Sequence, residues 1–186
     1  MQINSIEKPA EECISLDLAK EYLRVDHAGE DRVISGMIPA AREIIQNKTG
    51  YYIGPQKVQV TVPLIKRKGR QITPRTVGYM RGRTCIRLPL SPIISVDSVK
   101  VMALDGTETV VPEGKYHPNL NTYPALVILD YEDKDMAVID LTVGTENPSD
   151  TLLQRVLGTV ADLYENRHAT ESMFYQPLTS GGGIHP

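Results

Sequence analysis

The chain has 186 residues, of which 41% are hydrophobic and 23% are charged, and its net charge is -3 at pH 7. This composition is typical of a globular protein and excludes global disorder. A chain of this length buries about 70% of its unfolded surface, so its core needs no disulfides or metals. No apolar run approaches the roughly 20 residues of a membrane span, and the polar start of the chain does not look like a secretory signal.

The small net charge hides a strong asymmetry along the chain. Residues 44–96 contain ten basic and no acidic residues, which gives +10, whereas the other 133 residues contain ten basic and 23 acidic ones, which gives -13. Such asymmetry is informative about partners rather than about fold. Cys13 and Cys85 are the only cysteines and have no metal-binding spacing, so a reduced, cytosolic origin is expected.

Three segments have the apolar periodicity of amphipathic helices. They cover residues 15–24, about 30–48 and about 148–167. The second is followed by Gly50, the usual residue just beyond a helix end. Pro39 lies inside it, and because proline removes a backbone donor, we expect a kink or two shorter helices there.

Between the second and third predicted helices, apolar residues alternate with polar ones, so the pattern repeats every two residues. Alternation over 57–62 and 99–103 predicts half-buried strands, and Asp105-Gly106 after the latter predicts a hairpin turn. Residues 125–129 are apolar on both faces, which predicts a central strand, and 137–143 predict another. The fold class is therefore α+β.

The order of these elements predicts an inserted domain. Residues 1–50 and 145–169 would form a small helical domain built from both chain ends. Residues 51–144 would form a mostly antiparallel β-domain inserted into it. Residues 170–186 are too short and glycine-rich to fold alone, so they form a flexible C-terminal tail.

The sequence contains no clear candidate for a catalytic or metal-binding site. The nucleotide-binding, zinc-protease and serine-hydrolase motifs are all missing from the sequence. A metal set of Asp26, His27, Glu30 and Asp31 is less favoured than a capped loop between two helices. His168 is more simply a surface histidine near a helix end than a catalytic one. We predict no catalytic residue, metal or cofactor.

One patch suggests a partner, the segment 66–83, which has no strand pattern and is expected to be a long exposed loop. Its basic residues are Lys66, Arg67, Lys68, Arg70, Arg75, Arg81 and Arg83. They could neutralise phosphates, with Tyr79 available for stacking, or dock on an acidic surface of a neighbouring protein chain. The two alternatives carry equal weight, and a merely solvated loop is the third.

The N-terminal pattern resembles that of tailed-phage head–tail connector (adaptor) proteins of the long form with a β-insertion. The matching residues are Leu16, Ala19, Lys20, Leu23, Arg24, Val25, Asp26, Glu30, Asp31, Ala40, Ala41, Arg42, Glu43, Thr49 and Gly50. The third helix ends in Tyr164, Glu165, Asn166 and Arg167, which is similar to the ending of the family. Residues 86–106 resemble its β-insertion, whereas Pro39 and the segment 66–83 depart from the pattern.

This resemblance implies a structural virion protein without enzymatic activity. Members form a ring, typically of twelve copies, that docks on the portal and extends the DNA channel toward the stopper or tail-completion protein. The location implied is the neck of the virion, after assembly in the host cytoplasm. Packaged double-stranded DNA is a further candidate partner, and no membrane is involved.

In such adaptors the C-terminal segment commonly reaches the portal. Here the tail carries apolar anchors and a glycine hinge, and a frayed terminus is the alternative. The predicted portal-docking residues are Met173, Phe174, Tyr175, Leu178, Ile184 and His185. The second hypothesis for the whole chain is a soluble DNA-binding or DNA-packaging accessory protein that uses 66–83.

Overall fold

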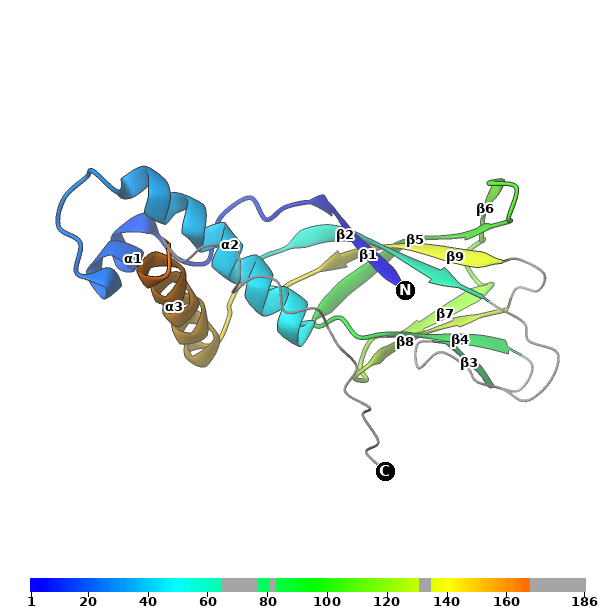
Figure 1. Cartoon of the computed structure of the whole chain (residues 1–186). Helices are drawn as coiled ribbons and strands as arrows, with labels where there is room; N and C mark the ends of the chain where they lie inside the picture. The colour runs from blue at the N-terminus through cyan, green and yellow to red at the C-terminus, as the bar shows by residue number, and fades with distance from the viewer. Residues whose placement is uncertain (65–76, 81–82, 131–134, 168–186) are drawn as a thin grey trace, which may run out of the picture.

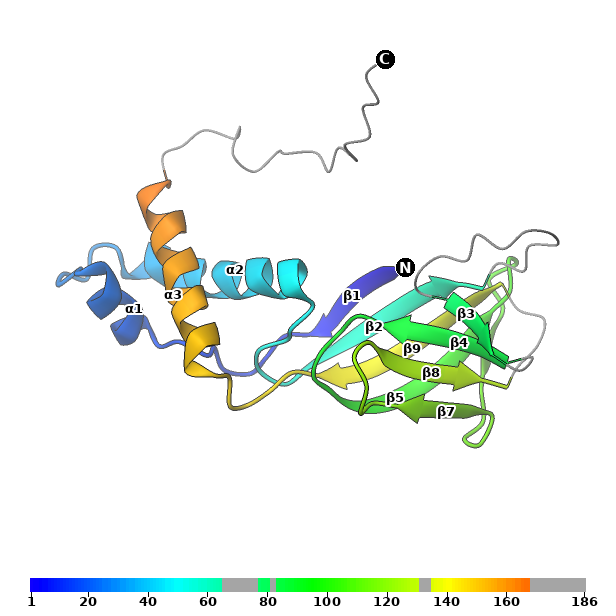
Figure 2. The same ribbon diagram turned by 90° about the horizontal axis from the view of Figure 1, so that it is seen from below.

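The computed structural model describes residues 1–64, 77–80, 83–130 and 135–167. These residues form an elongated molecule with helices at one end and two sheets at the other (Figures 1 and 2). The helices are α1 (Leu16–Leu23), α2 (Asp31–Thr49) and α3 (Asp150–Glu165). The predicted α+β class is confirmed, and helices from both ends of the chain pack together.

Local sequence signals set the helix boundaries. The Leu18 N–H donates to the Ser15 hydroxyl at 3.2 Å, which caps α1. Gly50 ends α2 with a φ of 70°, a left-handed conformation that glycine adopts without strain. Pro39 lies within α2, and the helix runs as one element from Asp31 to Thr49. Of the two alternatives expected at Pro39, a kink or two shorter helices, the second does not occur, because packing of the apolar face outweighs the lost backbone donor.

The strands form two antiparallel sheets. The first has the order β1 (Gln2–Glu7), β2 (Gln56–Pro63), β9 (Met136–Val143), β5 (Ile93–Met102) and β6 (Glu108–Val110). The second has the order β3 (Val77–Met80), β4 (Arg83–Leu88), β8 (Ala125–Leu129) and β7 (Tyr116–Asn119). As predicted, β8 is an interior strand, and the turn after β5 leads into a hairpin with β6.

The buried apolar residues fall into two clusters. One lies between the sheets, where alternate residues of β2 such as Val58 and Val60 face Ile86 and Val127 of the second sheet. The other lies among the helices and includes Ala19, which is fully buried. The proposed division of the chain into domains stays a prediction, since two clusters alone do not show that each part folds separately.

Two of the three segments that link the helices to the sheets lie side by side. Ile53 and Thr145 form an isolated bridge, in which the Gly54 N–H donates to the Thr145 carbonyl at 2.9 Å. Gly144 next to it has a φ of 113°, and a Cβ there would lie 2.0 Å from the Gly54 carbonyl oxygen. Only glycine fits this crossing.

Some strands were not expected from the sequence. Residues 2–7 form β1, an edge strand that is exposed throughout and has no clear alternation. The segment 66–83 was expected to be a loop without strands, but 77–80 form β3 and Arg83 begins β4, so that part was wrong. Pairing with β4 stabilises this short segment, a non-local cause that a pattern search cannot detect. Residues 170–186, the predicted tail, lie outside the described residues.

Among the described residues, no helix is long and apolar enough to cross a membrane.

Candidate functional site

The end of α3 is attached to the start of α2 by three side chains. The Tyr164 hydroxyl donates a hydrogen bond to one carboxylate oxygen of Glu30. The other Glu30 oxygen lies 3.2 Å from Nη2 of Arg167, and the Arg167 guanidinium lies 4.1 Å from the centre of the Tyr164 ring. This Glu30–Tyr164–Arg167 cluster holds the last described turn of the chain against the helical core.

A second ion pair closes the same end of the molecule. Lys20 of α1 lies 2.6 Å from the Asp31 carboxylate at the start of α2, and both side chains are partly buried. Glu30 and Asp31, two of the metal candidates, are therefore engaged with protein cations, whereas Asp26 and His27 are exposed. No group of metal-binding side chains occurs within the described ranges.

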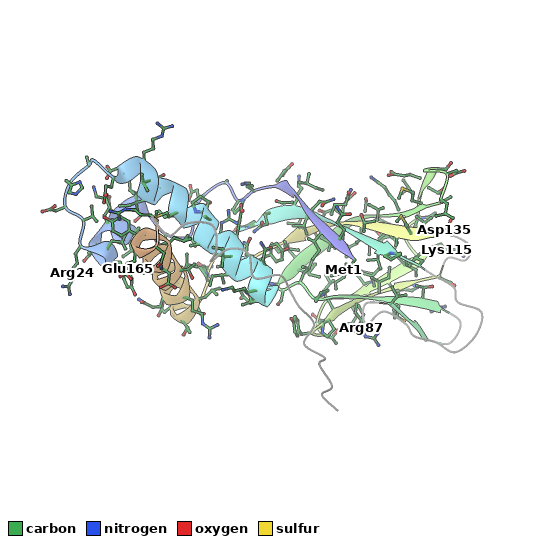
Figure 3. The ribbon with its side chains drawn as sticks, viewed as in Figure 1. Met1, Arg24, Arg87, Lys115, Asp135 and Glu165 are labelled. Atoms are coloured by element: carbon green, nitrogen blue, oxygen red, sulfur yellow. The ribbon has the colours of Figure 1, made fainter. Side chains whose placement is uncertain are left out.

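The remaining family-motif residues have local structural roles at this end. Leu23 packs against the helical cluster, and Arg24 ends α1 in a left-handed conformation with a φ of 59°. The Asn166 side chain donates to the Asp162 carbonyl at 2.8 Å. Arg24 and Glu165 both lie at the helical end of the molecule (Figure 3), and the structure thus brings the two motifs together.

A buried arginine links α2 to the segments that lead into the sheets. Arg42 is 1% exposed, and its Nε lies 2.8 Å from Oε2 of Glu12. Its Nη1 donates to the Gln46 side-chain oxygen at 3.1 Å, and Gln46 Nε2 donates to the Ile53 carbonyl at 3.2 Å. The guanidinium is thereby fully paired, as a buried charge requires. From the sequence, Arg42 was matched only to the family pattern, because its place on the helix gave no sign of burial.

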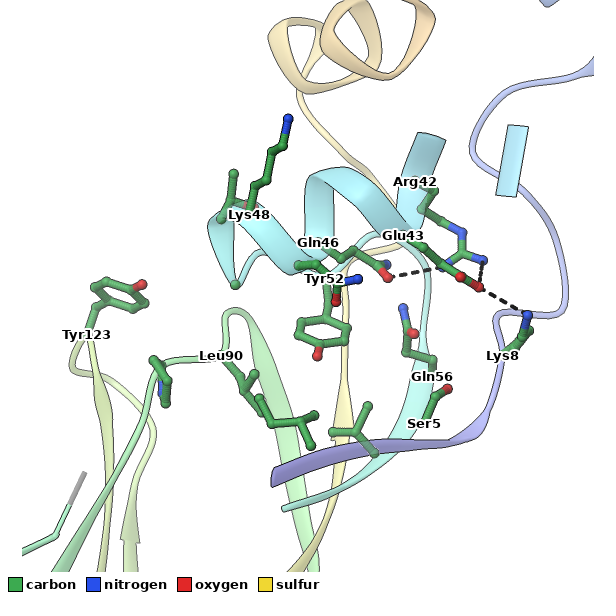
Figure 4. A pocket seen from close by; sticks show the side chains of 16 residues that line it. Ser5, Lys8, Arg42, Glu43, Gln46, Lys48, Tyr52, Gln56, Leu90 and Tyr123 are labelled. Carbon is green, nitrogen blue, oxygen red and sulfur yellow. Dashed lines mark hydrogen bonds and ion pairs between the residues drawn. The ribbon is translucent and has the colours of Figure 1, made fainter. Parts of the chain in front are cut away.

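A groove of about 570 Å³ opens beside this arginine, between the C-terminal half of α2, β1 and the segment after β4 (Figure 4). Ile3, Val58, Pro89 and Leu90 form apolar walls, and the exposed Tyr123 stands at one end. We call it the α2–β1 groove. Its volume falls in the range of about 300–1,000 Å³ that is usual for binding sites.

Two buried side chains present polar atoms to the α2–β1 groove. Tyr52 is 8% exposed and Gln56 is 5% exposed, and both line it. Gln56 Nε2 donates to the Ile53 carbonyl at 3.3 Å, but its oxygen and the Tyr52 hydroxyl have no hydrogen-bond partner in the described part of the chain. Every described polar side-chain atom that is sealed from solvent has a hydrogen-bond partner, so these two atoms are reachable by solvent. Burial raises the pKa of Tyr52, which keeps its hydroxyl protonated as a donor.

The outer face of the first sheet carries a polar network centred on Asp140. Its carboxylate accepts hydrogen bonds from Ser98 at 2.7 Å and Gln59 at 2.9 Å, and Lys100 lies 3.5 Å away. Partial burial by itself would raise the pKa of Asp140, but the hydrogen bonds and the lysine outweigh it and lower the pKa below its usual value. The network joins three neighbouring strands of the sheet.

Most of the predicted partner-contact residues cannot be placed. Of the basic patch, Arg83 is described and lies 3.7 Å from Asp130 on the neighbouring strand. Tyr79 contributes its backbone to β3. The other basic residues of the patch lie outside the described residues, namely Lys66, Arg67, Lys68, Arg70, Arg75 and Arg81. So do His168 and the predicted portal-docking residues Met173, Phe174, Tyr175, Leu178, Ile184 and His185.

Comparison with known proteins agrees with the predicted family. Residues 13–76 match the family described as phage gp6-like head-tail connector protein. No curated protein sequence matches the chain. The description of the family is that of a structural connector, which agrees with the prediction of a non-enzymatic protein.

Solved structures match over nearly the whole chain. One chain from the neck of an empty gene transfer agent (GTA) particle, computed with C6 symmetry, has a TM-score of 0.65 at 18% identity, covering 90% of this chain and 86% of that one. A chain from the virion of a native GTA particle has a TM-score of 0.67 at 17% identity, with coverages of 100% and 90%.

A third match comes from the neck of a native GTA particle, computed with C12 symmetry. Its TM-score is 0.58 at 16% identity, with coverages of 100% and 89%. At these identities the likeness shows a shared fold. Residues 13–76 thus match the phage gp6-like head-tail connector family, and the chain as a whole has the fold of these GTA particle chains.

Proposed function

We propose that this protein is a connector in the neck of a virion, at the interface between head and tail. The observation that carries the proposal is the family match over α1 and α2, together with a fold shared along the whole chain with chains of GTA particles. The chain forms a ring around the DNA channel, and twelve copies are supported by the C12 symmetry of one matching neck. It acts by binding and not by catalysis.

The proposal includes docking of the C-terminal segment on the portal. The Glu30–Tyr164–Arg167 cluster supports this role, because it anchors the chain at Arg167, directly before the segment that carries the apolar anchors. Because the segment is held in place at Arg167, it loses less conformational entropy when it binds. The opposite side of the ring then meets the stopper or tail-completion protein.

Deletion of residues 170–186 tests the docking. The truncated and full-length chains are mixed with portal-containing heads, and bound protein is measured after sedimentation of the heads. We expect the truncated chain to keep its melting temperature and to lose head binding. Normal binding of the truncated chain would refute docking through this segment.

The second candidate is a DNA-binding or DNA-packaging accessory protein, which the charge of +10 over residues 44–96 favours. Replacing Lys66, Arg67, Lys68 and Arg70 by glutamine separates the two functions. A DNA-binding protein would retard duplex DNA with an affinity that falls steeply with salt, and this variant would lose the retardation. A connector would keep its attachment to heads whatever its affinity for free DNA.

A further inference from the structure

The α2–β1 groove has several properties of a binding site. Part of its wall is apolar, and Tyr52 and Gln56, both more than nine-tenths buried, line it with a hydroxyl and an amide oxygen that have no hydrogen-bond partner among the described residues. Polar atoms that water can reach can exchange that water for a polar group of a ligand. One donor and one acceptor beside an apolar wall match the needs of a peptide backbone with an apolar side chain.

One cation without an ion pair among the described residues lies at the rim of the groove. Lys8, Arg42 and Lys48 line it together with one carboxylate, Glu43. Lys8 pairs with Glu43 at 3.0 Å and Arg42 pairs with Glu12, which leaves Lys48 without an ion pair among the described residues. The groove thus favours an occupant with an apolar residue next to carboxylates.

The end of the sheets away from the helices presents a segment of this kind (Figure 1). The turn between β5 and β6, residues 103–107, carries Leu104, which is 87% exposed. Leu104 is followed by Asp105 and lies close to Asp135, whose carboxylate accepts a hydrogen bond from the Leu104 N–H at 3.0 Å. Glu108 begins β6, so the turn is acidic as well as apolar.

The turn holds Leu104 in a fixed position. The Gly106 N–H donates to the Ala103 carbonyl at 3.0 Å, and the Thr107 N–H donates to the Asp105 carboxylate at 2.8 Å. Asp135, and with it this turn, lies at the end of the sheets away from the helices (Figure 3). An apolar side chain fixed on a tight turn loses little entropy on binding, which is typical of an interface anchor.

We propose that the 103–107 turn of one copy inserts Leu104 into the α2–β1 groove of a second copy. Charge complementarity favours this occupant, because the acidic turn meets Lys48. The two surfaces differ and lie apart on the molecule, so the contact is head-to-tail and can repeat from copy to copy, as ring formation requires. The inference rests on the proposed function, because it names the contact that joins neighbouring copies in the proposed ring.

Disulfide trapping between copies tests the contact. All variants carry Cys13→Ser, because Cys13 is partly exposed, whereas Cys85 is buried. Leu104→Cys and Tyr123→Cys place thiols on the turn and at the groove, at positions 87% and 68% exposed in the native fold. The full chains are mixed, bound to portal-containing heads and oxidised, and the products are separated without reductant.

The expected product of the mixture is a covalent dimer, with a ladder of longer oligomers when both cysteines are in one chain. Neither single variant should cross-link alone. The inference is overturned if head-bound chains give no cross-link, if Leu104→Cys pairs with itself, or if Tyr123→Cys joins a different protein. If one of these results is found and the chain still binds heads, the contact is refuted but the proposed function is not. If the chains form cross-linked oligomers but never bind heads, the proposed function is refuted but the contact is not.

A second variant pair tests the same contact without a disulfide. Leu104→Asp should weaken self-association on the head at least about tenfold, because it replaces the apolar anchor with a charge. Ile94→Asp is the matched control, since Ile94 is 53% exposed near the other end of β5. Equal weakening by both changes, or by neither, would contradict the contact.

Discussion

Arg42 and Glu12 are joined at two points although 30 residues separate them in the chain, with distances of 2.8 Å from Nε to Oε2 and 3.2 Å from Nη2 to Oε1. The guanidinium is 1% exposed, whereas the Glu12 side chain is 31% exposed. The pair therefore ties the segment before α1 to the middle of α2, at the edge of the α2–β1 groove.

Glu12→Ala should lower the free energy of unfolding by about 1–3 kcal/mol, because a buried charge loses its hydrogen-bonded partner. Urea denaturation measures the change. Lys8→Ala is the control, since its ion pair with Glu43 is largely exposed and should contribute within about 0.5 kcal/mol. A Glu12→Ala variant as stable as Lys8→Ala would show that Arg42 does not depend on Glu12.

The Glu30–Tyr164–Arg167 cluster predicts energetic coupling between α2 and α3. Tyr164→Phe removes only the hydroxyl that donates to Glu30 and should destabilise the protein by about 0.5–1.5 kcal/mol. In the Glu30→Gln background the same change should cost clearly less. A double-mutant cycle gives this difference, and strictly additive effects would mean that the two groups do not interact in solution.

Asp140 predicts a component of stability that depends on pH. Its pKa is lowered in the folded protein, so its contribution is present above the usual pKa of about 3.9 and is lost as the pH falls through the folded-state value. The gap in unfolding free energy between the native chain and Asp140→Asn should therefore be larger at neutral pH and narrow in acid. Urea titrations at several pH values measure it. A gap that stays constant across this range would contradict the prediction.

Gly144 and Gly158 should respond oppositely to the same substitution. Gly144→Ala places a Cβ 2.0 Å from a backbone oxygen at a positive φ, so we expect a loss of at least about 2 kcal/mol. Gly158 lies within α3 with no atom near its would-be Cβ, and Gly158→Ala should stabilise the protein by about 0.5–1 kcal/mol. Thermal melts compare the two variants, and equal effects would refute the close crossing at Gly144.

The helices and several strands were predictable because their signals are local. The Ser15 cap, Gly50 beyond α2 and the alternation over β2 each depend on a few adjacent residues. β1 and β3 were missed because pairing with a strand distant in sequence stabilises them. Locally weak strands of this kind have no pattern that a single sequence reveals.

The candidate sites were predictable only in part. The two family motifs meet in the structure, but the contact between Glu30 and Tyr164 spans 134 residues and could not be inferred from spacing. The α2–β1 groove combines residues of α2, β1 and three other segments, so no linear motif marks it. Burial of Arg42 depends on the same tertiary packing.

The bridge between Ile53 and Thr145 has an evolutionary consequence. Two of the three chain crossings between helices and sheets, the one before β2 and the one after β9, lie side by side. Everything between these two crossings could therefore lengthen, shorten or be exchanged while the helices stay in place. Relatives that keep the helical scaffold can then differ freely in the sheets they carry. Gly54 and Gly144, which allow the two crossings to touch, are the positions at which such exchange is most constrained.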